Sequence, residues 1–417
     1  MSNPNLAPIF PHVRYSDKGS TTVLNTADNL KALIEFSGLE AKLNKMTLEP
    51  DIFEAGSCIG APEVVRSRLI SEASIHSAPK SMIDDHFTAV AQQAEYHPVR
   101  EWLEGEWDGV RRLDTVLNCV KAQNQELSNQ VLTRWLVGCV ASLYIPNFKS
   151  KLVPVLQGAQ SFKKTAFVER IASVSEGAFL EGAELNPDNK DSVLSVIRSW
   201  IVELGELERS TKNCQGALKA FISRQVDTVR PPYGRTDIKK QRQTSLIATV
   251  NGTDFLKDET GNSRYAVIEL KDTVDMDTLN KTLGWQFEST GEVKLVEPDK
   301  LLQFWLEIKY LLLVKKYSWF LSNNELTLIA RESDKYVDKG AWHKVLNEHI
   351  DSCGDKARQW MTTKEICEFM KFDYSKANAV GKALTMLNKE GVLEKKLKDG
   401  VNRYCFPVVQ VIEHSFR

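Results

Sequence analysis

The spacing of hydrophobic residues changes several times along the chain, and each change predicts a different kind of element. Residues 1–95 carry short helical patterns interrupted by Gly and Pro, which predict a helical N-terminal region. Residues 96–150 remain helical in pattern and are strongly apolar from 134 to 144. Residues 151–275 alternate short β-rich runs, such as LVPVL and TSLIATV, with helical segments. This alternation is typical of an α/β domain with a mainly parallel sheet.

The chain beyond this α/β domain is predicted to be helical over residues 276–354 and to end in a small domain, residues 355–417. Residues 361–370 form a first helix behind an N-cap Thr, and apolar residues recur at helical spacing in a second helix over 380–387. An Asp-Gly turn between two alternating runs then predicts a β-hairpin. Two helices followed by a hairpin are the order of a winged helix, which binds duplex DNA through its second helix or, in many cases, another protein.

Composition narrows the class of protein. The chain has 417 residues with 42% hydrophobic and 26% charged content, which excludes a disordered or low-complexity protein. Its net charge of −1 gives no overall field for nucleic acid or membranes, so any basic surface is local. We find no apolar run of membrane-spanning length and no signal-peptide pattern, and we expect a soluble, cytoplasmic protein. The seven cysteines are scattered without a C-x-x-C pair, so we expect reduced thiols and no zinc site.

A phosphate-binding loop is the clearest candidate for chemistry. A buried-strand pattern at residues 152–157 is followed by GAQSFKKT, residues 158–165, and then by a helix. In such a loop the backbone N–H groups bind phosphate, Lys164 reaches the terminal phosphates of ATP, and the Thr165 hydroxyl binds Mg²⁺. Lys163 occupies the place of the second glycine of G-x-x-x-x-G-K-[ST], at a cost of ~1 kcal/mol if its backbone is left-handed. Taken alone, this altered loop is equally typical of an ordinary basic turn. The predicted nucleotide contacts are Gly158, Gln160, Ser161, Phe162, Lys163, Lys164 and Thr165.

Two further strand ends and one turn carry candidate catalytic residues. The apolar strand in residues 199–208 ends in acids, and we expect it to lie beside the strand of the phosphate loop. Glu206 is then the predicted general base and, with Thr165, a Mg²⁺ ligand, whereas Glu203 is either catalytic or a structural charge. Asn251 ends the next strand and either orients the attacking water or forms a turn. Arg264, on a Gly-Asn turn, is either an arginine finger for a neighbouring subunit or a surface ion-pair residue.

Two basic segments are candidates for DNA contact. Residues 230–242 hold five basic residues, one acid and a Pro-Pro-Tyr-Gly turn, a composition that suits a nucleic-acid backbone or a solvated loop. Residues 371–403 hold eight basic and four acidic residues. The predicted DNA contacts are Arg230, Tyr233, Arg235, Lys239, Lys240 and Arg242 in the first segment, and Lys376, Lys382, Lys395 and Lys396 in the second.

Several segments, taken in their order, resemble one known family. They are HPVREWLEGEWDGVRRLD, the phosphate loop, NPDNKD, WIVELGELE, LKAFISRQVDTVRPPYGR and NGTDFLKDETGNSRY. Between residues 96 and 270 the chain resembles the virulence-associated protein E family of P-loop ATPases, which is similar to the superfamily 3 helicases within the AAA+ ATPases. Members occur on phages and mobile genetic islands and are often attached to a primase.

The resemblance implies a ring-forming ATPase, a homo-hexamer around single-stranded DNA, that acts in replication of its element. On matching positions it assigns nucleotide binding to Gly158, Lys164 and Thr165, the acids to Glu206 and Glu203, the sensor asparagine to Asn251, the trans-acting arginine to Arg264, and DNA contact to the hairpin at residues 235–242. This sequence departs from the family at Lys163, and its N-terminal region is too short for the primase of longer relatives, so we expect any primase to be a separate protein.

Three functions were weighed. The first is an ATP- and Mg²⁺-dependent DNA helicase or replication initiator of a phage or mobile element. The second is an initiator or helicase loader that binds nucleotide without hydrolysing it, for which Lys163 is the hint. A metabolic kinase is disfavoured, because no lid motif accompanies the loop and a basic hairpin does.

Overall fold

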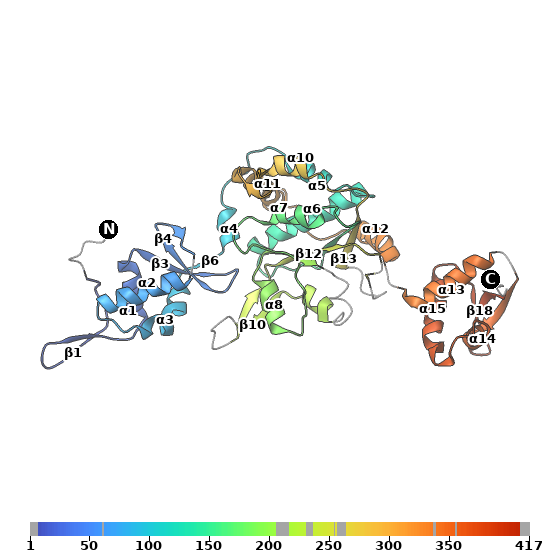
Figure 1. The fold of residues 1–417 in the computed structure, drawn as a ribbon, viewed down its shortest axis with the longest axis horizontal. Coiled ribbons are helices and arrows are strands. Elements are labelled where there is room, and N and C mark those ends of the chain that lie inside the picture. The colour runs from blue at the N-terminus through green and yellow to red at the C-terminus, as the bar shows by residue number, and fades with distance from the viewer. Residues whose placement is uncertain are drawn as a thin grey trace. The chain divides into compact units, whose positions relative to one another are not determined.

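The computed structural model describes residues 7–60, 62–205, 217–230, 237–253, 255–256, 264–336, 339–354 and 357–408. The chain divides into two compact units, one of residues 1–252 and 261–333 and the other of residues 253–260 and 334–417 (Figure 1). In the described part of the chain, no helix combines the length and the apolar character that a membrane crossing requires.

The N-terminal region of the first unit contains a sheet as well as helices. Its elements are β1 (Val13–Tyr15), β2 (Thr21–Val23), α1 (Ala27–Phe36), β3 (Leu39–Asn44), β4 (Pro50–Glu54), β5 (Ser57–Cys58), α2 (Pro62–Ile75), α3 (Ser81–Ala91) and β6 (Glu95–Tyr96). Four of the strands form a sheet in the order β5-β4-β3-β6, and α1 and α3 pack against it around a separate hydrophobic cluster.

The prediction of a purely helical N-terminal region was therefore wrong. The sequence has a helical pattern over residues 29–46, but α1 ends at Phe36 and Gly38 follows with a φ of 71°. Beyond this left-handed glycine, Leu39, Ala41 and Leu43 are buried at every second position, which is the period of a strand.

A five-stranded parallel sheet forms the centre of the first unit. Its strands are β7 (Val153–Gln157), β8 (Phe179–Leu180), β9 (Ile201–Gly205), β12 (Ser245–Val250) and β13 (Tyr265–Glu269), in the order β13-β7-β12-β9-β8. The predicted α/β class with a parallel sheet is thus confirmed. The order corrects one expectation, because β12 lies between the strand of the phosphate loop and the acid-bearing strand β9.

The remaining elements of this unit are helices and hairpins that precede, separate and follow these strands along the chain. They are α4 (Pro98–Trp102), α5 (Leu113–Cys119), α6 (Gln125–Tyr144), α7 (Lys164–Ala172), α8 (Lys190–Ile197), α10 (Met276–Leu283), α11 (Pro298–Leu313) and α12 (Asn323–Ser333), with two hairpins, β10 (Val226–Val229) with β11 (Ile238–Gln241) and β14 (Trp285–Phe287) with β15 (Val293–Leu295). Residues 217–222 are also helical.

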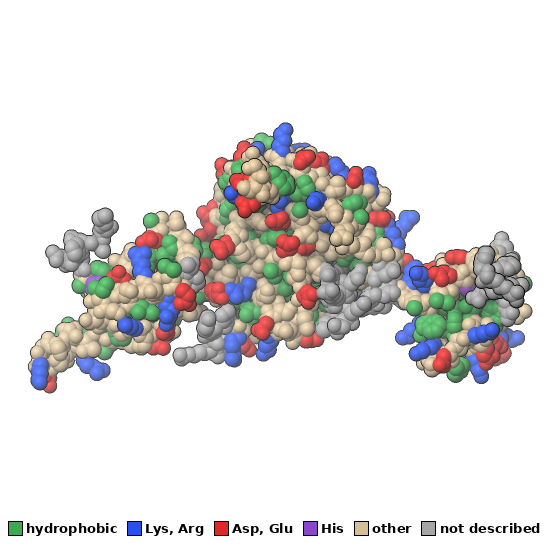
Figure 2. All heavy atoms as spheres, in the orientation of Figure 1, with side chains coloured by type: hydrophobic (Ala, Val, Ile, Leu, Met, Phe, Trp, Pro, Cys, Tyr) green, Lys and Arg blue, Asp and Glu red, His purple; other side chains and the backbone are tan. Residues whose placement is uncertain are grey.

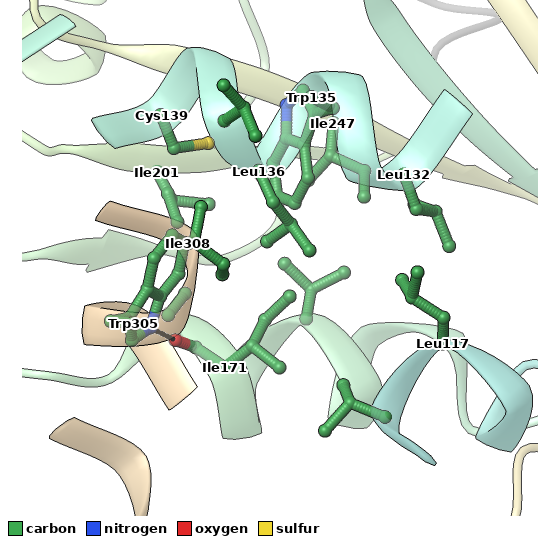
Figure 3. Packing of buried hydrophobic residues seen from close by; sticks show 14 of the residues in the cluster. Leu117, Leu132, Trp135, Leu136, Cys139, Ile171, Ile201, Ile247, Trp305 and Ile308 are labelled. Atoms are coloured by element: carbon green, nitrogen blue, oxygen red, sulfur yellow. Dashed lines mark hydrogen bonds between the residues drawn. The ribbon is translucent and has the colours of Figure 1, made fainter. Parts of the chain in front are cut away.

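Aromatic side chains join these helices to the sheet (Figure 3). Trp135 of α6 is buried and donates a hydrogen bond from its indole N–H to the Leu246 carbonyl of β12, at 2.8 Å. Trp305 of α11 donates to the Ile171 carbonyl at the end of α7, also at 2.8 Å, and lies 4.5 Å from the ring centroid of Trp200. Because buried indoles are both large and hydrogen-bonded, they fix α6, α7 and α11 around the strands that carry the candidate site.

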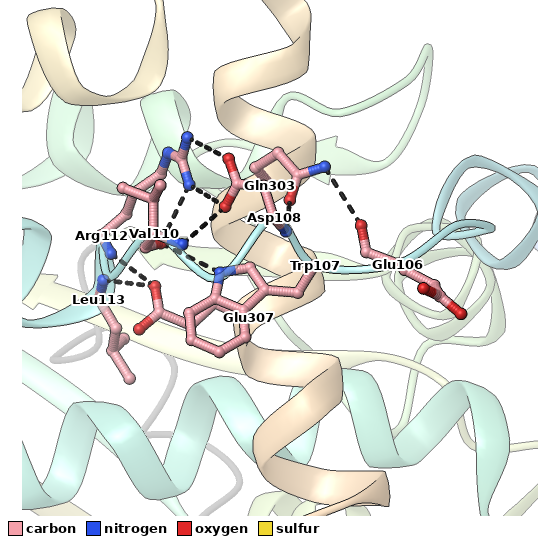
Figure 4. Close-up of polar contacts among 8 residues, drawn as sticks. All are labelled: Glu106, Trp107, Asp108, Val110, Arg112, Leu113, Gln303 and Glu307. Atoms are coloured by element: carbon pink, nitrogen blue, oxygen red, sulfur yellow. Dashed lines mark hydrogen bonds and ion pairs between the residues drawn. The ribbon is translucent and has the colours of Figure 1, made fainter.

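The segment EWDGVRR, quoted above among the family-like motifs, has a structural role (Figure 4). The buried carboxylate of Glu307 in α11 accepts the backbone N–H groups of Arg112 and Leu113 at 2.6 and 2.9 Å and so caps the start of α5. Asp108 binds the Arg112 guanidinium at 2.8 Å. Burial raises the pKa of Glu307, and the two N–H groups oppose that shift.

The second unit contains η2 (Asp334–Tyr336), α13 (Gly340–Cys353), β16 (Arg358–Thr362), α14 (Thr363–Phe369), η3 (Tyr374–Lys376), α15 (Ala377–Lys389), β17 (Lys395–Lys398) and β18 (Val401–Pro407). The strands pair antiparallel in the order β16-β18-β17. Both predicted helices and the hairpin are present, and Thr362 caps α14 in a capping box with Glu365. Leu346 and Ile350 of α13 share a core with Leu384 and Phe406, so the boundary expected between residues 354 and 355 falls inside this unit.

Candidate nucleotide site

The loop between β7 and α7 has the backbone shape that the sequence suggested. Lys163 directly precedes α7 with a φ of 59° and a ψ of 28°, which is left-handed. The second glycine of the ordinary motif would take this conformation without strain, whereas a lysine has a Cβ that opposes it. Gly158 is required for another reason, since a Cβ there would lie 2.9 Å from the Phe162 ring.

Lys164 lies at the centre of the site. Its side chain is buried, and its ammonium donates hydrogen bonds to the carbonyls of Gly158 and Ala159 at 2.8 and 2.9 Å. It also donates to Asn251 Oδ1 at 2.9 Å, from the end of β12. Burial lowers the pKa of Lys164, and the charge of Glu203 opposes that shift. All three hydrogen-bond acceptors are neutral, so the carboxylate of Glu203 acts on the lysine through its charge and without a direct hydrogen bond to the ammonium.

Glu203 is the carboxylate that the fold brings to this loop. It is 2% exposed on β9, and its Oε1 accepts the hydroxyl of Thr165 at 2.7 Å and the hydroxyl of Thr249 at 2.6 Å. Its Oε2 accepts the backbone N–H of Gly182 at 3.1 Å. The alternative of a solvated edge charge is therefore excluded for Glu203. Glu206, the predicted base, lies outside the described residues.

The strand order explains how these side chains meet. Val250 of β12 pairs with Gln157 of β7, and Thr249 pairs with Gly205 of β9, so the carboxyl ends of the three strands are level. Asn251 consequently lies between the loop and the acid strand and contacts Lys164. Parallel α/β sheets bind ligands at this edge.

Arg264 lies at the opposite edge of the same sheet. It precedes β13, whose first residue Tyr265 pairs with Val153 at the start of β7. The five residues of β7 separate it from the phosphate loop by roughly 16 Å along the strand. Its Nε donates to Ser223 Oγ at 3.2 Å. Arg264 therefore does not join the site of its own chain.

Three residues near Glu203 were not predicted. Thr249 could have been suspected as the hydroxyl residue in the apolar run TSLIATV, but the sequence contains no signal for the Gly182 N–H. A Cβ on Gly205 would lie 2.9 Å from Gly182 Cα, so glycine is needed for this close approach. Glu181 is exposed beside them, and burial together with the charges of Glu203 and Glu169 raises its pKa.

A family model matches the part of the chain that carries this site. Residues 101–286 match the model of the virulence-associated protein E-like domain, a span that includes the phosphate loop, Glu203 and Asn251. Over these residues the chain is similar to that domain. Solved structures of the apo C-terminal region of NrS-1 are also similar, one with a TM-score of 0.47, 12% identity and coverage of 91% of this chain and 99% of that one. A second has a TM-score of 0.45 with 12% identity, 91% and 98% coverage. No curated protein matches the chain.

The basic hairpin β10–β11 is anchored to the fold by two residues that were predicted to contact DNA. Lys240 is 6% exposed and donates to the carbonyls of Met46 and Ile197, each at 2.5 Å. Burial lowers its pKa to about 7, against the attraction of Asp227. Arg242 is 5% exposed and forms two hydrogen bonds with Asp227, at 2.6 and 2.7 Å.

The prediction of DNA contact is therefore wrong for Lys240 and Arg242, because their charges are used inside the fold. Arg230 and Lys239 are exposed, with Arg230 3.4 Å from Asp237, and their predicted DNA contact is not tested. Tyr233 and Arg235 lie outside the described residues.

The second unit carries the remaining predicted DNA contacts. Lys376, Lys382, Lys395 and Lys396 are all exposed. Lys382 faces a groove of about 1360 Å³ lined also by Asn378 and Thr385 of α15, by Lys364 of α14 and by Asn402 of the hairpin. Lys396 lies elsewhere, 3.8 Å from the centroid of the Trp360 ring.

Proposed function

We propose that this chain is a P-loop ATPase of the superfamily 3 helicase type, with a C-terminal winged helix, that acts on DNA in replication of a phage or mobile element. The observation that supports it best is the convergence of Lys164, Asn251 and the Thr165–Glu203 pair at one sheet edge. The family match over residues 101–286 supports the biological setting.

The residues present fit ATP with Mg²⁺. Lys164 has a buried ammonium with neutral partners, which suits the β- and γ-phosphates, and the first N–H groups of α7 have no intrahelical acceptors. Thr165 and Glu203 supply the hydroxyl and the carboxylate that hold a hydrated Mg²⁺ in P-loop proteins. When bound, the ion neutralises charge that develops on the phosphates. Asn251, which contacts Lys164, is proposed to orient the attacking water, and Glu206 remains the proposed base.

A ring assembly, proposed as a homo-hexamer, follows from the place of Arg264. Because Arg264 lies at the sheet edge opposite its own phosphate loop, it can serve as an arginine finger only for a neighbouring subunit. Its hydrogen bond to Ser223 holds it half-buried, and an approaching subunit would supply phosphate in place of that hydroxyl.

DNA contact is proposed at two places. Single-stranded DNA in the ring would contact Arg230 and Lys239 on the hairpin β10–β11, and duplex DNA would contact α15. The exposed side of α15 presents Asn378, Lys382 and Thr385, which are donors suited to base edges and phosphates and include no acid. A separate primase is proposed as a partner.

A non-hydrolysing initiator or loader is the second candidate, and the left-handed Lys163 favours it. Its left-handed backbone and its side chain lie at the position where the ordinary motif has a glycine without a side chain.

ATP turnover with and without DNA tests the proposal and separates the two candidates. Lys164→Ala should abolish nucleotide binding, whereas the adjacent Lys163→Ala serves as a matched control and should retain it. DNA-stimulated phosphate release supports the ATPase. Nucleotide binding without release supports the loader. Equal loss in both variants would contradict the assigned site.

A further inference from the structure

The basic residues of the second unit lie on two opposite faces of its sheet. Tyr404 and Phe406 of β18 are at most 2% exposed and face the hydrophobic cluster of the helices. Residues between them on the strand must point to the other face. Arg403 and Cys405 therefore lie on the outer face, away from α15.

Strand register places four more residues on that outer face. Trp360 of β16 is opposite Cys405, and Lys396 of β17 is opposite Arg403. Directly opposed residues of antiparallel strands share a face, and so do residues two positions along. The outer face thus carries Arg358, Trp360, Lys396, Lys398 and Arg403. The short distance from Lys396 Nζ to the Trp360 ring, 3.8 Å, agrees with this arrangement.

Charge and aromatic character on this face suit a particular ligand. Arg358, Lys396 and Lys398 are exposed, and Trp360 and Arg403 are half-buried. Glu365, which lies outside the strands, is 3.6 Å from the Arg403 guanidinium. The strand residues of this face include no acid. Figure 2 shows Lys and Arg side chains interspersed with hydrophobic and acidic ones on the visible side of the second unit.

We propose that this outer sheet face binds single-stranded nucleic acid, with a base stacked on Trp360 and the phosphates contacted by Arg358, Lys396 and Lys398. An aromatic residue among cations on an open sheet is suited to unpaired bases, which expose their ring faces, and not to duplex DNA, whose bases are already stacked. The flexible Lys396 ammonium can move from the ring to a phosphate when a base takes its place. The inference extends the proposed function on DNA by giving the second unit a single-strand site as well as a duplex surface.

Adjacent lysines provide a matched pair for the test. Lys395 and Lys396 have the same charge and neighbouring backbone positions, but Lys395 points to the α15 side, 6.0 Å from the Tyr404 ring. The full chain is titrated with a fluorescent dT20 oligonucleotide and with a 20-base-pair duplex, without nucleotide, by fluorescence anisotropy over a range of salt.

Lys396→Ala should weaken dT20 binding and lower its salt slope by roughly 0.7, the value for one lost phosphate contact on a single strand. Trp360→Ala should weaken it roughly 5- to 100-fold, and Trp360→Phe should restore most of that loss. Lys395→Ala should leave dT20 affinity unchanged. Melting curves of each variant check the fold, and Lys396→Ala, at an exposed position, keeps the test valid if Trp360→Ala is unstable.

Three outcomes would overturn the inference: no dT20 binding by the full chain, equal effects of Lys395→Ala and Lys396→Ala, or loss of duplex binding alone in the outer-face variants. A protein that binds dT20 through this face but releases no phosphate from ATP would instead contradict the proposed ATPase and leave the single-strand site standing. Titrations with dU20 and rU20, which differ only in the 2′-hydroxyl, show whether the site distinguishes DNA from RNA.

Discussion

Replacing Lys163 with glycine should stabilise the phosphate loop, because Lys163 is held in a left-handed conformation at a φ of 59°. For a residue with a Cβ this costs about 1–2 kcal/mol. Glycine removes that cost but loses about 0.4–1 kcal/mol through the greater freedom of the unfolded chain. The expected net gain in the free energy of unfolding is therefore about 0.5–1 kcal/mol, which corresponds to about 1–3 °C in the melting temperature of a unit this large.

Alanine at the same position is the control that isolates backbone strain. Lys163→Ala removes the charge but keeps the Cβ, so it retains the strain that Lys163→Gly relieves. Melting curves with and without ATP should place Lys163→Gly above Lys163→Ala in stability, and both should bind nucleotide. If Lys163→Gly is the less stable of the two, the left-handed conformation is wrong. If Lys163→Gly loses ATP binding while Lys164→Ala keeps it, Lys163 is the phosphate lysine and the register of the loop is wrong.

Three further predictions address the rest of the chain. Glu206→Gln and Arg264→Ala should each stop ATP turnover, and mixing the two should restore part of it at interfaces that pair an intact Glu206 with an intact Arg264; mixed assemblies without recovery would exclude a shared site. The free energy of unfolding of the wild type, relative to that of Lys240→Met, should rise by up to about 1.4 kcal/mol per pH unit above pH 7. The reason is that the pKa of Lys240 is lowered to about 7 in the folded chain, whereas the unfolded lysine stays protonated up to about pH 10.4. If melting curves at pH 7 and pH 9 give the same stability difference between the two proteins, this prediction is wrong. Lys382→Ala should weaken duplex DNA binding and reduce its salt slope by about 0.9, the value for one lost phosphate contact, as measured by anisotropy, and an unchanged slope would contradict a place for Lys382 in the duplex surface.

Part of the candidate site could be predicted from sequence because the phosphate loop and Asn251 directly follow the ends of strands. A buried-strand pattern followed by Gly158, or by Asn251, places the polar residue at the carboxyl edge of a parallel sheet whatever the strand order. The order itself could not be predicted, since sequence patterns do not say which strands are neighbours. For that reason the sequence did not single out Glu203 over Glu206. Glu203 lies two residues before the end of β9. Its role depends on hydrogen bonds from Thr165 of α7 and Thr249 of β12.

The boundaries of the second unit along the chain depend on packing between segments that are distant in the sequence. The sequence shows α13 as one more helix of residues 276–354, yet Leu346 and Ile350 are buried against the helices and sheet that follow. Each buried leucine or isoleucine contributes about 1.5–3 kcal/mol of hydrophobic stabilisation. A fragment that began at residue 355 would lose both contacts, so DNA binding by this unit is better measured with point variants of the full chain.

Charge counting is least reliable where basic residues lie on strands. Lys239 and Lys240 are neighbours in β11, but the alternation of a strand exposes the first and buries the second. Lys395 and Lys396 differ in the same way, toward α15 and toward Trp360. Consecutive basic residues on a helix are distributed around the helix axis, whereas consecutive basic residues on a strand alternate between the two faces of the sheet, which have different neighbours. The five basic residues of 230–242 therefore overstate the charge that the hairpin exposes, because Lys240 and Arg242 are buried, and those of the C-terminal sheet are divided between the α15 side and the outer face.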